Sequence, residues 1–251
     1  KGACKMRVRI TSQGFPVITF SKMSQNDILY AELGAAIAKS PKLERRLLTA
    51  SDLEKGRSQE DTDEPEKSVV GKLLSDWNRT QTRKQIGEER AYALYTPKAD
   101  EQKLTLRSCF PGTIMEWDCK ERGEIFAVSD SFLVAEIEVK SRVYHTENAS
   151  VKKFSDTNDV FQRFSGNGRV WLEVHGDLEE IDLYPGESVQ ICPGFFLAMS
   201  EDVKIEMVSA GDVLLRNREN RDYWIQLTAG EKGGTVFCHS VDPKQFWTQH
   251  K

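Results

Sequence analysis

The chain has 251 residues, with 39% hydrophobic and 29% charged residues, 35 Lys and Arg against 39 Asp and Glu, and a net charge of -4. This balance excludes a disordered chain and leaves no basic field over the whole chain that could hold a nucleic acid. No run of about eighteen apolar residues predicts a transmembrane helix, and residues 1–4 do not begin a signal-peptide pattern. We therefore expect a soluble globular protein.

Internal self-similarity is the most informative feature of the sequence. One pattern, in which an acidic residue is followed by apolar alternation, a small residue, an apolar run and Ala, aligns without gaps over residues 27–38, 124–135 and 187–198. A shorter apolar motif occurs at residues 91–96, 160–165 and 223–228. Such periodicity is typical of a chain built from repeated units.

The spacing of the motifs supports a threefold repeat. Ala135 and Val160 are 25 residues apart, as are Ala198 and Tyr223, and the second and third units begin 63 residues apart. The first two units begin 97 residues apart, and an insertion of 28 residues with a turn longer by 6 accounts for the excess. We predict one domain over 5–245 made of repeats at about 6–108, 109–175 and 176–241, an insertion at 41–90 and a tail at 242–251.

Each unit has the pattern of β-hairpins. Alternating or β-branched runs such as 170–174 are separated by turn sequences such as Pro185-Gly186 and Gly233-Gly234. A single unit of this size cannot bury its own apolar face. The predicted fold is therefore all-β: three repeated hairpin units in a pseudo-threefold β-sandwich or prism, with a charged and partly helical insertion in the first repeat.

The insertion combines a charged loop with a helical pattern. Residues 43–63 are highly charged and lead into the acidic run 60–66, and residues 68–90 have apolar residues at helical spacing. The basic side chains of this segment, interleaved with one indole, are Lys72, Trp77, Arg79, Arg83, Lys84 and Arg90. They could contact RNA through phosphates and stacking, or the Trp77 face could dock on the sandwich while the basic residues face solvent.

The C-terminal tail carries two adjacent aromatic residues. Phe246 and Trp247 lie beyond the last repeat. Two interpretations stay open: the pair packs back on the fold, or it anchors in a partner.

Four segments resemble the altered-inheritance-of-mitochondria (Aim24) family: residues 110–114, 164–172, 180–187 and 194–200. The resemblance spans residues 6–240 in the family's order. It implies a triply repeated β-sandwich similar to the tryptophan attenuation RNA-binding proteins, bacterial relatives of uncertain function, and eukaryotic relatives in mitochondria that are linked to inner-membrane organisation. The chain departs from the family in lacking a Gly-rich stretch near 151–155 and 211–215 and in its charged insertion.

No catalytic constellation is recognisable in the sequence. The four histidines are isolated from one another, so a cupin-like metal site is disfavoured, and His145 and His175 are expected in exposed loops. The five cysteines are scattered without metal-ligand spacing and are expected to be free thiols. We therefore expect no enzymatic activity and no cofactor.

The expected function is that of a structural or assembly scaffold. The protein would act through contacts with other proteins in a larger complex, in mitochondria by resemblance or in the cytoplasm if the source is bacterial. An RNA-binding scaffold associated with ribosome biogenesis is the alternative, and a small-molecule or metal-binding enzyme is the least favoured. DNA binding and a transmembrane segment are not expected, whereas peripheral membrane association stays open.

Overall fold

A computed structural model describes residues 5–12, 14–48, 92–145, 160–209 and 223–242. This part of the chain consists almost entirely of antiparallel strands, in agreement with the predicted all-β class. Its only α-helix is one turn long, α3 (Cys119–Arg122). None of its helices is long and apolar enough to cross a membrane.

The strands form three consecutive units, which we call units 1, 2 and 3. Unit 1 contains β1 (Arg7–Thr11), β2 (Val17–Met23), β3 (Leu29–Glu32), β4 (Ala36–Lys39), β5 (Leu43–Leu48), β6 (Tyr92–Pro97) and β7 (Gln102–Arg107). Unit 2 contains β8 (Gly112–Asp118), α3, β9 (Ile125–Val128), the 3-10 turn η2 (Ser129–Ser131), β10 (Phe132–Glu136), β11 (Val139–His145), β12 (Val160–Gly166) and β13 (Arg169–His175). Unit 3 contains β14 (Leu178–Leu183), β15 (Ser188–Ile191), η3 (Pro193–Phe195), β16 (Phe196–Ser200), β17 (Val203–Ser209), β18 (Tyr223–Ala229) and β19 (Gly234–His239).

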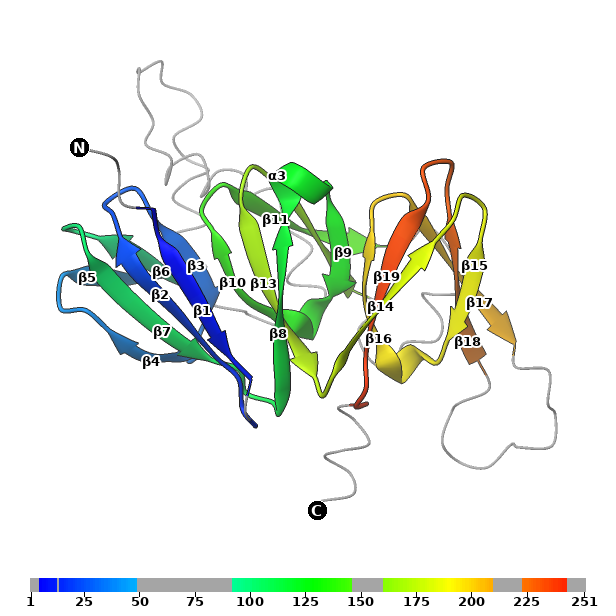
Figure 1. Ribbon diagram of the computed structural model, residues 1–251, viewed down its shortest axis with the longest axis horizontal. Helices are drawn as coiled ribbons and strands as arrows, with labels where there is room; N and C mark the ends of the chain where they lie inside the picture. Colours follow the sequence, from blue (N-terminus) through cyan, green and yellow to red (C-terminus); the bar gives the residue numbers. More distant parts are fainter. Residues whose placement is uncertain (1–4, 13, 49–91, 146–159, 210–222, 243–251) are drawn as a thin grey trace.

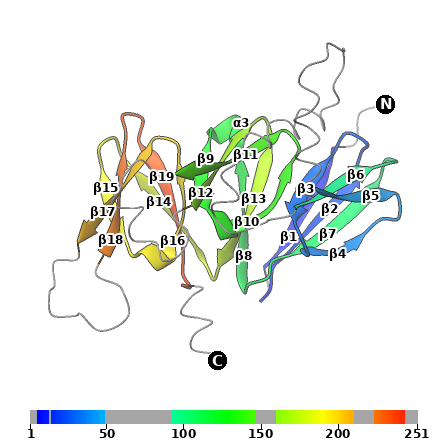
Figure 2. The same cartoon turned by 180° about the vertical axis from the view of Figure 1, so that it is seen from behind.

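The same order of six strands occurs in all three units, and unit 1 has the additional strand β1 at the edge of sheet A. Sheet A has the order β1-β2-β7-β4, sheet B β5-β6-β3-β10-β13-β8, sheet C β11-β12-β9-β16-β19-β14 and sheet D β15-β18-β17. Sheets B and C each take three strands from one unit and three from the next, through the antiparallel pairs β3·β10 and β9·β16. The units follow one another in a row, from unit 1 at the left of Figure 1 to unit 3 at the right, and Figure 2 shows the same order from behind. The sheets thus form an open series and not a closed ring.

The hydrogen-bond register corrects the alignment of the repeats by one residue. Ala31 pairs with Val134 at the first junction and Ala127 pairs with Ala198 at the second, each next to the same bulge in the following strand. Ala31 therefore corresponds to Ala127, whereas the gapless alignment matches it with Val128. A shift of one residue exchanges the two faces of a strand, so the structural register decides which side chains are equivalent.

The insertion begins later than the sequence pattern indicates. Residues 43–48 were expected to belong to a charged loop, but they form β5, which pairs along its whole length with β6. Leu43 is fully buried, and the exposed Glu44 forms an ion pair with Lys98 at 2.6 Å. The sequence of β5 does not alternate between apolar and charged residues, so the strand is recognised by its pairing with β6 and not by a local pattern. The predicted helix at 68–90 lies outside the described residues.

Aromatic side chains pack the core across the boundaries between units. The ring of Tyr92 meets that of Phe132 edge-on at 5.3 Å, and Trp117 meets Phe237 at 5.6 Å. Such pairs contribute about 1 kcal/mol each beyond the area that they bury. The units are therefore joined both by shared sheets and by a shared core.

Candidate functional site

The site residues predicted from the sequence all lie outside the described part of the chain. They are Lys72, Trp77, Arg79, Arg83, Lys84, Arg90, Phe246 and Trp247. Their roles stay predictions. The described residues present three other features: a segregation of charge, a pocket at the boundary of units 2 and 3, and buried ionisable side chains.

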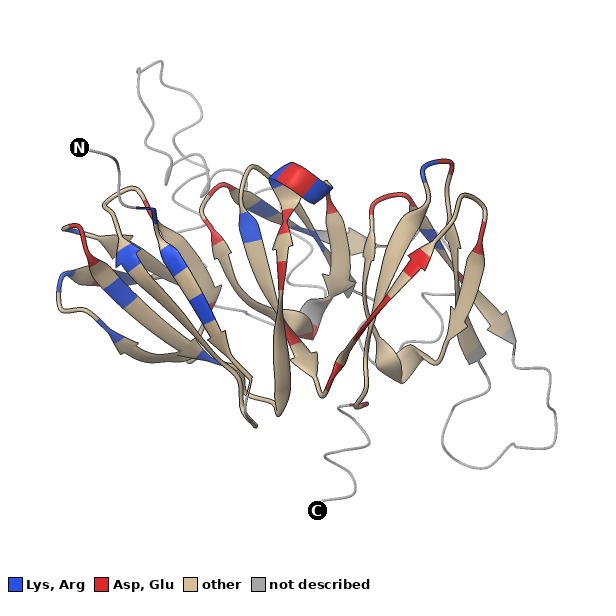
Figure 3. Cartoon of the chain, viewed as in Figure 1, with Lys and Arg blue, Asp and Glu red and all other residues tan. Residues whose placement is uncertain are grey.

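Charge is segregated along the row of units. In unit 1, residues 5–12, 14–48 and 92–111 hold 11 Lys and Arg against 5 Asp and Glu. In unit 3, residues 176–209 and 223–242 hold 2 Lys and Arg against 10 Asp and Glu. In Figure 3 the Lys and Arg positions predominate on unit 1 and the Asp and Glu positions on unit 3, whereas unit 2 carries both. A near-neutral chain thus carries a net charge of +6 at one end and -8 at the other, counted over these residues.

The outer face of sheet A carries a group of exposed basic side chains. Arg7 and Arg9 alternate with half-buried residues along β1, and Lys103 and Arg107 project in the same way from β7. A β-strand directs alternate side chains to one face, so the period of two in the sequence places these cations together in solvent. Such a face attracts acidic surfaces.

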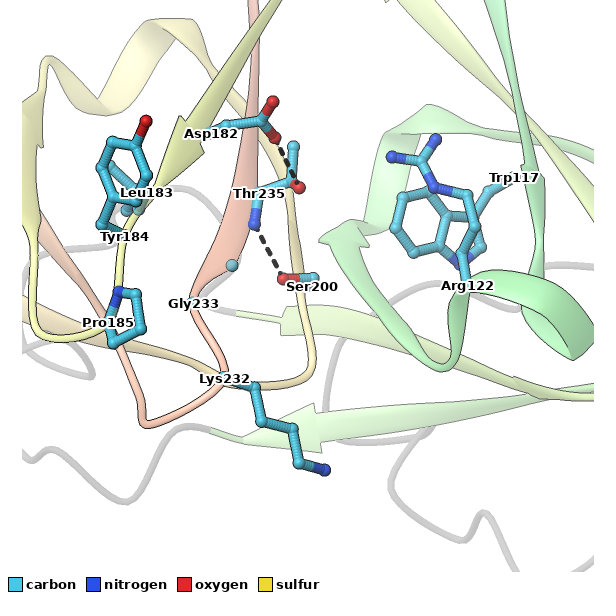
Figure 4. Close-up of a pocket in the computed structure, with 11 residues that line it drawn as sticks. Trp117, Arg122, Asp182, Leu183, Tyr184, Pro185, Ser200, Lys232, Gly233 and Thr235 are labelled. Atoms are coloured by element: carbon cyan, nitrogen blue, oxygen red, sulfur yellow. Dashed lines mark hydrogen bonds between the residues drawn. The ribbon is translucent and has the colours of Figure 1, made fainter.

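A pocket of about 440 Å³ lies between units 2 and 3 (Figure 4). Its unit 2 wall is the guanidinium of Arg122, which lies 4.0 Å from the ring centroid of Trp117 and donates to Glu180 Oε1 at 2.9 Å. Helix α3 places Arg122 there, because Asp118 caps it by accepting from the backbone N–H groups of Lys120 and Glu121. Cation–π contact and an ion pair together fix the position of this side chain.

The unit 3 wall is polar and held by hydrogen bonds. Thr235 donates its hydroxyl to Asp182 at 3.0 Å and its backbone N–H to the Ser200 hydroxyl at 3.0 Å. Tyr184 projects beside them with 80% of its surface exposed. An exposed ring among charged and hydroxyl groups at an open pocket is typical of surfaces that bind other proteins.

Two buried histidines form a pair that sequence reasoning missed. His175 and His239 end β13 and β19, and their rings stack at 5.0 Å with an interplanar angle of 21°. His239 donates Nε2–H to the carbonyl of Gly194 at 3.0 Å, and the Nδ1 atoms of both rings have no partner among the described residues. His175 was expected in an exposed loop. The pairing of β13 and β19 with neighbouring strands buries both rings, which no local sequence pattern reveals.

Burial decides the protonation of this pair. It lowers the pKa of His175 to about 4, with a contribution from His239, and it also lowers the pKa of His239. Both imidazoles are therefore neutral near pH 7. No group of three or more His, Cys, Asp and Glu among the described residues is placed to hold a metal ion. His145 lies in β11, and His250 lies outside the described residues.

Glu173 is a buried carboxyl on β13. Burial, followed by the charge of Glu32, raises its pKa to about 7, and its Oε1 atom has no hydrogen-bond partner within the described part of the chain. Hydrogen bonds from Ser108 and the backbone of Cys109 oppose the shift. Cys109 is a free thiol, as are Cys119, Cys192 and Cys238.

Comparisons with known proteins agree with the fold. The family model described as "Mitochondrial biogenesis AIM24" matches residues 8–241. Comparison with curated protein sequences gave no match. Among solved structures, the chain is similar to the crystal structure of protein SPYM3_0169 from Streptococcus pyogenes, with 15% identity, a TM-score of 0.67 and 98% of each chain covered. At this identity the likeness concerns the fold alone.

Proposed function

The chain belongs to the mitochondrial biogenesis AIM24 family, and on that premise we propose that it is a non-enzymatic structural or assembly protein that acts in mitochondria through contacts with other proteins. The charged and aromatic side chains of the described surface are suited to contacts with other proteins more than to catalysis. The family description supports the cellular role, and the surface supports the mode of action.

The segregation of charge is the observation that carries this proposal. A net charge of +6 on unit 1 and -8 on unit 3 is maintained over rigid antiparallel sheets. Each end therefore attracts a surface of opposite sign and repels one of its own, which confers specificity and orientation on protein contacts. The pocket with the exposed Tyr184 adds an aromatic anchor on the acidic unit.

Co-purification tests this function. The full chain would be recovered under native conditions at low and moderate salt, and the associated proteins identified by mass spectrometry. We expect a defined set of partners that a double variant of unit 3, Glu179→Lys with Glu206→Lys, depletes at least tenfold. The matched control, Glu121→Lys with Glu44→Lys, makes the same change of charge outside unit 3 and should retain them. Recovery of the chain without any partner would contradict the proposal.

RNA binding is a second candidate, favoured by the basic outer face of sheet A. Arg side chains there could contact phosphates, and the affinity would then fall steeply as salt rises. Fluorescence anisotropy with single-stranded RNA would measure this, and Arg7→Ala with Arg9→Ala should weaken binding and flatten the salt dependence. The basic residues Arg79 and Arg83 of the insertion would be replaced in a parallel variant. Absence of binding at low salt would exclude this candidate.

A further inference from the structure

Two sheet edges at opposite ends of the molecule are unpaired among the described strands. Of the strands that the structure describes, β7 alone pairs with β4 at the end of sheet A, and β18 alone pairs with β15 at the end of sheet D. Figure 1 places them at the left and right ends of the row. An edge strand presents free backbone N–H and C=O groups, so it can accept a further strand.

These edges are the two halves of a junction that the chain forms twice within itself. At the first junction β3 of unit 1 pairs with β10 of unit 2, and at the second β9 of unit 2 pairs with β16 of unit 3. In the repeating strand order, β15 is the counterpart of β3 and β9, and β4 is the counterpart of β10 and β16. A third junction of the same kind would join β15 to β4.

The side chains of β4 are exposed where those of its counterparts are buried. The bulges, between Ala36 and Ala38, Phe132 and Val134, and Phe196 and Ala198, set the correspondence. The residue within each bulge is Ile37, Leu133 or Leu197. Ile37 is 55% exposed, whereas Leu133 and Leu197 are fully buried. An aliphatic side chain at a position buried in both internal junctions indicates that β4 too is covered in the assembled protein.

An aromatic contact at each internal junction has an unfilled counterpart at the open ends. Tyr92 meets Phe132 at 5.3 Å across the first junction, and Phe161 meets Phe196 at 5.8 Å across the second. The first aromatic residue of each contact, Tyr92 or Phe161, has the same place in its unit. It lies five residues before the residue that pairs with the first residue of β5 in unit 1, or of β11 in unit 2, and β17 is the corresponding strand of unit 3. In unit 3 that position is Trp224, which is 41% exposed.

The partner of Trp224 in a third junction would be the counterpart of Phe132 and Phe196. That residue is Ala36 on β4, and it is exposed. The largest aromatic side chain of the three would thus face the smallest partner, and the small Ala36 leaves room for the larger ring of Trp224. Such room matters where a junction must pack to native density, because overpacking is destabilising.

The charges of the two ends favour the same contact. β4 belongs to the unit with a net charge of +6 and β15 to the unit with -8. Lys39 lies on the β4 edge itself, and Glu187 directly precedes β15. Opposite ends therefore attract, whereas two copies brought together by the same end repel.

We propose that a second copy of this chain supplies the missing strand: β15 of one copy pairs antiparallel with β4 of the next and continues the sheets from molecule to molecule. The internal registers place Ile191 opposite Ala38, Gln190 opposite Lys39 and Trp224 over Ala36. The two edges differ, so the contact is head-to-tail and generates a ring or a filament. This inference rests on the proposed assembly function, of which it names one partner.

Mass measurement in solution is the first test. We expect light scattering of the full chain after gel filtration to give at least twice the mass of one chain, decreasing on dilution and at high salt. Ile37→Glu and Trp224→Glu, each at an exposed position of one end, should both reduce it to the mass of a monomer. Phe15→Glu is the matched control, because Phe15 is 56% exposed away from both edges, and it should leave the mass unchanged. A wild-type chain that is monomeric at the highest concentration would overturn the proposal.

Cysteine cross-linking tests the register. Lys39→Cys and Gln190→Cys would be made in separate chains in which the exposed Cys109, and also Cys4, are replaced by Ser. Facing residues of an antiparallel pair lie within disulfide reach. We expect a cross-linked dimer from the mixture of the two variants and not from either alone, nor from Lys39→Cys mixed with Glu206→Cys.

The outcomes separate this inference from the proposed function. Cross-linking of Lys39→Cys to itself would indicate a symmetric contact and refute the head-to-tail arrangement. A monomeric chain that still co-purifies with other proteins would refute the self-association alone. A monomer that recovers no partner would refute both.

Discussion

Glu136 accepts three hydrogen bonds from Arg169, one from the backbone N–H at 2.8 Å and two from the guanidinium, Nε at 3.1 Å and Nη2 at 2.6 Å. Both side chains are about four-fifths buried, and they join β10 to the start of β13. The guanidinium also lies 5.1 Å from the ring centroid of Trp171. The ion pair thus holds together the neighbouring antiparallel strands β10 and β13 of sheet B.

Removal of this carboxylate should destabilise the fold. We expect Glu136→Ala to lower the free energy of unfolding by about 3 kcal/mol, because the largely buried guanidinium loses both hydrogen bonds to Glu136 and is left with the longer contact to Glu116 at 3.8 Å. Urea denaturation followed by tryptophan fluorescence would measure the loss. The exposed pair between Glu44 and Lys98 offers the comparison, and Glu44→Ala should change stability little. Equal effects of the two substitutions would argue against a structural role for the buried pair.

The buried histidine pair should make stability fall in acid. The pKa of His175 is about 4 in the folded protein and 6.5 in the unfolded chain, so the unfolded state binds the proton more readily between these values. The stability associated with the neutral His175 side chain is complete above pH 6.5 and is lost progressively as the pH falls toward 4. At pH 5 the loss should be about 2 kcal/mol for this residue. Unfolding free energies of the wild type and His175→Gln at pH 7.5 and 5 would measure it, and equal pH dependence in both would refute the assignment.

Glu173 should have the opposite effect on stability. Its pKa is raised to about 7 in the folded protein from 4.5, so the folded state holds the proton more tightly. The stability associated with the neutral carboxyl is complete below pH 4.5 and is lost as the pH rises through 7. At pH 8, Glu173→Gln should therefore be more stable than the wild type, by up to about 3 kcal/mol. The measurement is urea denaturation from pH 4 to 8 in both proteins, and a variant less stable than the wild type at pH 8 would contradict the prediction.

Gly166 should tolerate no side chain. Its φ is +120°, and a Cβ atom would lie 2.3 Å from the carbonyl oxygen of Glu138, which is backbone and cannot move aside. We expect Gly166→Ala to cost more than about 2 kcal/mol. Gly186 isolates the effect of φ, because it has φ +76° with nothing within 4 Å of the added carbon. Thermal unfolding of the two variants should show the larger decrease in Tm for Gly166→Ala, and the reverse order would contradict the steric argument.

Local patterns were sufficient to predict the class of the fold but not its register. Alternation, β-branched or aromatic runs and turn residues predicted strands in units 2 and 3, such as the run 170–174, which lies in β13. The charged residues of β5 concealed a strand, since only the pairing with β6 shows that Leu43 is buried. Likewise, His175 and His239 are 64 residues apart, and only the sheets bring their rings together. The sequence also does not distinguish an open row of units from a closed ring. The strands and turns are the same in both arrangements, which differ only in the strand edges that remain unpaired.

The strand order identifies one connection in every unit where chain length can vary. β5 and β6, β11 and β12, and β17 and β18 are equivalent hairpin pairs, and the segments between them span residues 49–91, 146–159 and 210–222. The entropy of closing a loop grows only with the logarithm of its length, so tripling a connection costs about 1 kcal/mol. In each unit the junction strand, β3, β9 or β15, pairs with the second strand of this hairpin, so the strands that hold the units together are separate in sequence from the connection. Small insertions could therefore lengthen this connection during evolution while the pairing that holds the units together is preserved. A binding peptide could be inserted at the same place by design.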